Sequence, residues 1–291
     1  MMDLRRDLPA RLERVTDTGL ISEAHSSSRA VIERAAIEPA LERAKLAAAD
    51  RELRSKAYAP LLRLISQDAE AQEAWKSLRE LIAQSVERRK NLLPVRSVTG
   101  GWSSFDLHPN LNMFTPPYDL DAVNEMSGPA VTASADRVAA AVAVGLGAGD
   151  HDGGARVASA QISIVLRSST AGVLRFCPWL NYQWSYAITA SFCLGAEIEG
   201  NVITTVVENG RLVGTQNLRL FSATDGVASE TGSIGSALEI YFPIEPGRNY
   251  VCSVTATIWG DQSGSGFLFG DSSFSNGRVR LEVPMLVADL R

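Results

Sequence analysis

The sequence predicts an α+β protein in which an N-terminal α-helical segment precedes an antiparallel β-sandwich, jelly-roll or immunoglobulin-like. Apolar residues recur at helical spacing in the first ninety residues, whereas alternate residues are apolar in most segments after residue 158. All the lysines also lie in the first ninety residues. We therefore expect a helical segment or bundle over 1–93, an irregular linker or strap over 94–157 and a β-sandwich domain over 158–291.

Composition and charge exclude several classes of protein. The 291 residues are 45% hydrophobic and 21% charged, as in folded globular proteins. The net charge is −5 and no long block of like charge occurs, so neither nucleic acid nor an anionic membrane is an expected partner. No signal-peptide pattern and no membrane-spanning apolar run is found. We expect a soluble protein, either cytoplasmic or associated with a virion or similar assembly.

The helical pattern is clearest over 66–90. Ser66 or Asp68 can accept hydrogen bonds from the first turn, and the basic residues at 88–90 suit the negative end of the helix dipole. One apolar stripe follows steps of four and three along this segment: Ala71, Trp75, Leu78, Ile82 and Val86. The spacing predicts a single amphipathic helix.

Two prolines guide the interpretation of the preceding residues. Proline is tolerated in a first helical turn, and Pro39 and Pro60 therefore predict helices near 38–55 and 59–66. No heptad pattern continues across them, which favours a compact bundle or a docking arm over one coiled coil. A short apolar stripe is formed by Ile37, Leu41, Ala44 and Ala48.

Residues 94–157 are rich in glycine, proline and other turn formers. One possible strand or helix lies at 136–145. A connection this long without regular structure is uncommon within a compact domain, so we expect a linker or a strap along a surface.

After residue 158 the apolar period is two, as in strands with one buried face. Asn209-Gly210 is a hairpin turn signal between two of the strands. Expected strands lie near 158–166, 172–192, 201–208, 211–222, 237–243, 249–259 and 278–287. Strands at this spacing, without helices between them, predict a sandwich.

Pro246-Gly247 followed by Tyr250 and Cys252 resembles the E–F corner of immunoglobulin-like and fibronectin-type-III-like sandwiches. The resemblance implies that the tyrosine hydroxyl bonds back to the corner backbone. Cys252 falls on the apolar face of its strand, whereas Cys193 falls on the opposite face of its own, which disfavours a disulfide between them. Free thiols are the expected state, and the cysteine spacing indicates no zinc site.

Candidate chemistry is sparse. Asp150, His151 and Asp152 lie on a glycine-rich loop and offer ligands for a divalent cation, although a solvated turn is the favoured interpretation. Phe269-Gly270-Asp271-Ser272 superficially resembles the nucleophile block of GDSL-type hydrolases, but all three histidines precede it. We expect no enzymatic activity, no metal and no cofactor.

Aromatic residues are the remaining candidates for binding. They are Trp179, Tyr182, Trp184 and Tyr186 in one expected strand, and Phe267 and Phe269 in the long loop 260–276. Exposed rings of this kind stack on sugars or form interface hot spots. The favoured alternative is that the strand rings fill the sandwich core or lie beneath the helical segment.

These observations favour a non-enzymatic structural or interaction protein. We expect a self-associating assembly subunit, resembling virion fibre or decoration proteins in architecture, that presents a β-sandwich head to protein partners or further copies of itself. The alternative is a lectin-like sandwich that binds carbohydrate or another ligand through the aromatic residues. A third hypothesis is an enzyme or metal protein centred on 150–152.

Overall fold

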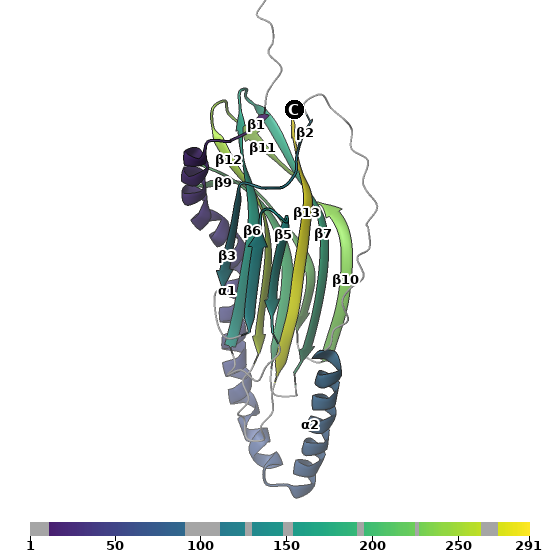
Figure 1. Ribbon diagram of the computed structural model, residues 1–291. Helices are drawn as coiled ribbons and strands as arrows, with labels where there is room; N and C mark the ends of the chain where they lie inside the picture. Colours follow the sequence, from purple (N-terminus) through teal and green to yellow (C-terminus); the bar gives the residue numbers. More distant parts are fainter. Residues whose placement is uncertain are drawn as a thin grey trace, which may run out of the picture.

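The computed structural model describes residues 12–90, 111–125, 130–147, 154–190, 195–224, 227–262 and 273–291. Two helices lie near the start of the chain and strands make up the rest (Figure 1). The elements are β1 (Leu12–Arg14), α1 (Thr18–Ile65), α2 (Ala69–Lys90), β2 (Leu111–Phe114), β3 (Leu120–Glu125), β4 (Val131–Asp136), β5 (Ala141–Leu146), β6 (Gly154–Ser168), β7 (Gly172–Thr189), β8 (Ala196–Glu208), β9 (Arg211–Thr224), β10 (Val227–Ala237), β11 (Ile240–Ile244), β12 (Asn249–Gln262) and β13 (Phe274–Leu290).

The strands form two antiparallel sheets that pack face to face. Sheet A has the order β1-β6-β12-β8-β9, with β3 also paired to β6. Sheet B has the order β10-β7-β13-β5-β4, with β11 also paired to β7 and β2 to β13. One large apolar core contains residues of both sheets. The predicted β-sandwich after an N-terminal helical segment is therefore confirmed.

The inner face of β12 supplies much of this core. Its inward side chains, each 0% exposed, are Tyr250, Cys252, Val254, Ala256 and Ile258. The predicted orientation of Cys252 is confirmed, and this thiol is free, as is that of Cys177. Cys193 lies outside the described residues.

The predicted corner at the start of β12 is confirmed. The Tyr250 hydroxyl accepts a hydrogen bond of 2.8 Å from the backbone N–H of Glu245. Gly247 has a φ of 77°, a value that glycine adopts without steric cost. The tyrosine thus fixes the turn that leads into the central strand of sheet A.

The β8–β9 hairpin turns at the predicted Asn209-Gly210. Their φ angles of 46° and 75° are both positive, as the favoured two-residue hairpin turn requires. The turn residues therefore set the register of two long strands.

Helix α1 is longer than the sequence predicts. It starts after Asp17, whose carboxylate accepts hydrogen bonds from the N–H groups of Gly19 and Leu20. It continues to Ile65 with Pro39 and Pro60 inside it, so the separate helices predicted at 38–55 and 59–66 are wrong. Both prolines are exposed, and water can therefore satisfy the carbonyl groups that they leave unpaired.

The first part of α1 covers the outer face of sheet A instead of packing into a helical bundle. Ile37 and Ala40 contact Ile203 and Trp259 in a cluster of their own. The outward side chains of β6 were expected to face solvent. These side chains are instead buried beneath neighbouring elements, with exposed fractions of 1–2%: Ser159, Gln161 and Ser163.

The second helix matches the sequence prediction. Asp68 accepts hydrogen bonds from the N–H groups of Glu70 and Ala71, so it is the N-terminal cap. Figure 1 shows α2 returning from the far end of α1 toward the edge of the sandwich where β7 and β10 lie. Neither described helix is apolar enough over sufficient length to span a lipid bilayer.

The segment predicted to be an irregular strap over 94–157 contains strands β2 to β5 and the start of β6. These elements belong to both sheets, so the sandwich begins well before residue 158. The four complete strands have only four to six residues each and consist partly of small or polar residues, which weakens their alternation. The possible element at 136–145 is a turn followed by most of β5. Strand β10 was also missed, because its sequence is mostly small and polar.

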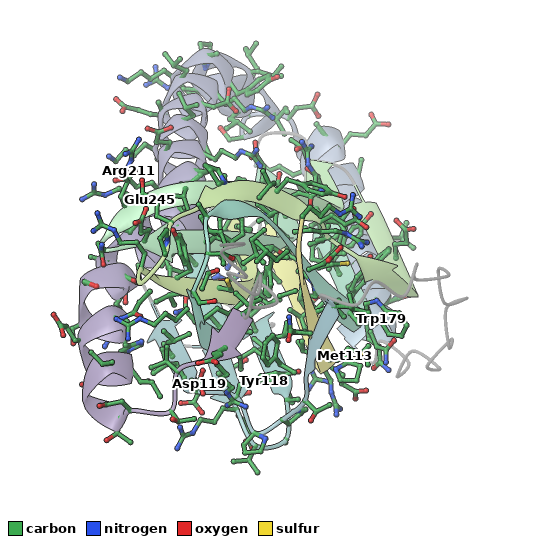
Figure 2. All side chains as sticks on the ribbon, turned by 90° about the horizontal axis from the view of Figure 1, so that it is seen from above. Met113, Tyr118, Asp119, Trp179, Arg211 and Glu245 are labelled. Atoms are coloured by element: carbon green, nitrogen blue, oxygen red, sulfur yellow. The ribbon has the colours of Figure 1, made fainter. Side chains whose placement is uncertain are left out.

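Asp119, which lies beside Tyr118 in Figure 2, joins three parts of the chain. Its carboxylate accepts hydrogen bonds from the Arg14 side chain at 2.7 Å and from the Val165 N–H at 2.8 Å. The neighbouring Tyr118 donates its hydroxyl proton to the carbonyl of Val283 in sheet B, at 2.7 Å. This region therefore connects the chain start to both sheets.

We predict that Cys177 and Cys252 resist alkylation in the folded protein. Burial raises the pKa of Cys177 to about 11 and raises that of Cys252 further, so both remain protonated at neutral pH. Peptide mass spectrometry after iodoacetamide treatment should show both residues unmodified in the native protein and modified after denaturation in urea. Rapid native labelling of Cys252 would contradict its placement in the core.

We predict that Tyr250→Phe lowers the free energy of unfolding by about 1–2 kcal/mol, because the Glu245 N–H loses its acceptor. The matched control is Tyr241→Phe. The hydroxyl of Tyr241 donates to Glu239, and Tyr241 is 50% exposed. Loss of this hydroxyl should therefore lower the free energy of unfolding by less than about 0.5 kcal/mol. Urea denaturation of both variants checks this difference, and equal losses would argue against the corner.

Candidate interaction surface

The aromatic residues of β7 do not form one exposed row. Tyr182 and Tyr186 are 2% and 7% exposed and belong to the core between the sheets. Trp184 is half-buried and packs against the same core. Trp179 is half-buried and lies at an odd-numbered position, on the opposite face of the strand.

Phe221 of β9 links the inward rings to sheet A. Its ring centroid lies 4.9 Å from that of Tyr186 and 5.6 Å from that of Trp184. Gly232 leaves room for the indole, because a Cβ there would lie 2.2 Å from a ring atom of Trp184. Gly200 does the same for Phe221, at 2.4 Å. These contacts pack one sheet against the other and leave no open platform for a sugar ring at Tyr182 or Tyr186.

Several sequence candidates lie outside the described residues. They are Phe267, Phe269, Asp150, His151, Asp152 and the block at 269–272. Among the residues that the structure describes, no group of three or more histidine, cysteine, aspartate or glutamate side chains is arranged to hold a metal ion.

The buried charges of the described chain serve as structural anchors. Glu199 is 4% exposed and pairs with Arg43 of α1, while it accepts a hydrogen bond from Asn201 at 2.8 Å. Arg156 is 5% exposed and donates to the carbonyl groups of Gly147 and Ser275. Burial lowers the pKa of Arg156, and Asp261 opposes this effect. These contacts hold elements in place and do not converge on an open site.

Exposed leucines distinguish the far half of α1. Leu46, Leu53 and Leu64 are 71%, 66% and 65% exposed, and Leu61 is 39% exposed. At 100° per residue, the first three lie within about 20° of one direction and Leu61 lies about 60° away. We call these four residues the leucine stripe. Single exposed apolar residues are ordinary, whereas several on one helix face make that face a candidate interaction surface.

The fold explains why the leucine stripe is left uncovered. The Arg43–Glu199 ion pair lies next to the apolar cluster of Ile37 and Ala40, and together these contacts hold α1 to sheet A. Beyond them α1 continues past the end of the sandwich, as Figure 1 shows. Helix α2 leaves the stripe open and carries one further exposed leucine, Leu81, at 63%.

Sequence reasoning missed this surface. The leucines at 46, 53 and 64 are visible in the sequence, but their alignment on one helix face is not. A helix that ends near Pro60 would place the third leucine on a different helix from the first two. The predicted stripe of residues at 37, 41, 44 and 48 also differs from the outcome: Ile37 is buried and Leu41 half-buried, whereas Ala48 is exposed. A continuous helix from 18 to 65 would have revealed the alignment.

No family model matches the chain, and no curated protein matches it. Weak likenesses exist to solved structures. An arabinose-bound α-L-arabinofuranosidase shares 11% identity over 62% of this chain and 23% of its own, with a TM-score of 0.16. A chain of infectious bursal disease virus, Gx strain, shares 15% identity over 65% and 42%, with a TM-score of 0.18.

A family 29 carbohydrate-binding module in complex with cellulohexaose shares 12% identity over 54% of this chain and 94% of its own, with a TM-score of 0.12. This chain thus spans less than half of the first two proteins. At TM-scores this low, none of the three likenesses supports a functional assignment.

We predict that Trp184 and Gly232 are energetically coupled through their contact. Trp184→Ala should cost about 2–4 kcal/mol of unfolding free energy, and Gly232→Ala about 1–3 kcal/mol, because its Cβ would strike the indole. The double variant should lose clearly less than the sum, since the indole that obstructs the new methyl group is absent. Urea denaturation measures all three, and Asn181→Ala, exposed on the same strand, is the control. Additive losses would contradict the contact.

Proposed function

We propose that the protein is a non-enzymatic, self-associating assembly subunit that presents its β-sandwich as a head and associates through the far half of α1. The leucine stripe carries this proposal, since three of its members are 65–71% exposed on one helix face. Exposed apolar area of this kind is stabilised when a partner removes it from water. In organisation such a subunit resembles virion fibre or decoration proteins.

The arrangement of anchors supports the same role. Apolar contacts and the Arg43–Glu199 ion pair attach the first half of α1 to the sandwich, and the other half extends past it. Three of the buried charged side chains that the structure describes have structural partners: Glu199, Arg156 and Asp119. No convergent set of acid, base and nucleophile occurs among the described residues.

We predict that the protein sediments as an oligomer at micromolar concentration and that Leu53→Glu weakens this association by roughly tenfold or more, because a charge would replace an apolar contact. The helix should persist, since Leu53 is 66% exposed. Sedimentation velocity measures association, and circular dichroism checks the fold.

The matched control is Val138→Glu, which changes a 68% exposed residue in the turn between β4 and β5. This variant should associate like the wild type. A monomeric wild-type protein would overturn the proposed function. Equal association of Leu53→Glu and Val138→Glu would show that another surface mediates assembly.

A further inference from the structure

We propose that the leucine stripe binds the same stripe of a second copy, with the two α1 helices antiparallel about a two-fold axis near residue 55. This inference rests on the proposed function and specifies its interface. The partner is thus a second copy of this chain, bound through a surface that both copies share.

The spacing of the stripe is the first argument for a second copy. Leu61 lies about 60° from the other members and is not part of this spacing. The remaining members and the exposed Ala57 follow one another at steps of seven, four and seven: Leu46, Leu53, Ala57 and Leu64. This series is identical when the helix is read in the opposite direction. An antiparallel second copy therefore presents the same pattern, which is the self-complementarity that a two-fold interface requires.

Side-chain size also favours the antiparallel arrangement. With the axis near residue 55, Leu53 faces Ala57 of the second copy, so a large residue lies opposite a small one on both sides of the centre. Leu46 faces Leu64 of the second copy, which places leucine against leucine at both ends. A parallel pair would set Ala57 against Ala57 and leave a gap between the helices.

The charges beside the stripe are compatible with this contact. Asp50 and Arg54 form an ion pair of 2.6 Å on one flank, and Glu52 and Lys56 form one of 2.5 Å on the other. Both flanks are therefore neutral near the proposed axis. In an antiparallel pair each flank faces the same flank of the other chain, so Glu52 of one chain comes near Lys56 of the other.

Length and exposure fit a modest interface. Residues 46 to 64 span about 27 Å of helix, at 1.5 Å per residue. A single helix face of this length is smaller than a standard protein interface, so we expect association at micromolar concentration. The Arg43–Glu199 anchor would place the two sandwich heads toward opposite ends of the helix pair.

Disulfide trapping tests the orientation. Single cysteines are introduced at the stripe in a Cys193→Ser protein, where Cys177 and Cys252 remain buried. A mixture of Leu46→Cys and Leu64→Cys should form disulfide dimers roughly tenfold faster than either variant alone, because only the mixture brings two thiols together. Leu53→Cys mixed with Ala57→Cys should behave in the same way.

The control is Val138→Cys, which is exposed and lies near the first turns of α1, far along the helix from the leucine stripe. Its neighbour Arg137 donates to Asp121, whose charge acts on His25. Faster dimer formation by Leu46→Cys alone would indicate a parallel pair and overturn the proposal. Cross-linking of the mixtures at the Val138→Cys rate would also overturn it. If Cys193→Ser does not fold, mass spectrometry of cross-linked peptides gives the same comparison with Cys193 in place.

Two further outcomes separate the alternatives. A wild-type oligomer without the cross-linking pattern would overturn this interface but leave self-association intact, whereas a wild-type monomer would overturn both. Flotation of wild-type protein, but not Leu53→Glu, with vesicles of equal parts phosphatidylcholine and phosphatidylserine would assign the stripe to lipid. That result would replace the second copy as its partner.

Discussion

The burial of β12 on both faces is the constraint on which the rest of the structure depends. Its inner residues fill the space between the sheets, and its outer residues, including Thr255, Thr257 and Trp259, are at most 3% exposed. A central strand of this kind needs a cover over sheet A, because its outer face would otherwise expose apolar and polar groups that are now buried. Helix α1 is that cover, which fixes where its first half lies.

The cover is only partly apolar. Apolar contacts occur near Ile32 and near Ile37, while Ser28, Thr205 and Thr255 are buried side chains without a hydrogen-bond partner of their own. Buried hydroxyl groups without a partner cost free energy, so the apolar contacts near Ile32 and Ile37 must outweigh that cost. The Arg43–Glu199 pair lies where α1 leaves the sheet. It separates a helix half that stabilises the sandwich from a half that is available to a partner.

Prediction from sequence succeeded where one local rule decided the outcome. The Asn209-Gly210 hairpin, the Asp68 cap and the Tyr250 corner each depend on a few neighbouring residues. It failed where contacts with distant parts of the chain, or exposure to water, overrode a local rule. Pro39 and Pro60 remain inside α1 because both face water, and the polar outer face of β6 is buried because a helix covers it. The short strands β2, β3 and β5 gain stability from long neighbours, and β4 pairs with β5, which their own sequences do not reveal.

The sequence by itself determined the two classes of structure, the strand faces and most turns, because side-chain period and turn chemistry act over a few residues. It also contained the palindromic spacing of Leu46, Leu53, Ala57 and Leu64. Only the tertiary structure decided which apolar residues remain exposed. The inward rings of β7 (Tyr182, Trp184 and Tyr186) pack in the core because sheet A covers them, whereas the leucine stripe stayed open because α1 extends past the sandwich. Burial depends on contacts between distant segments, and no local pattern specifies them.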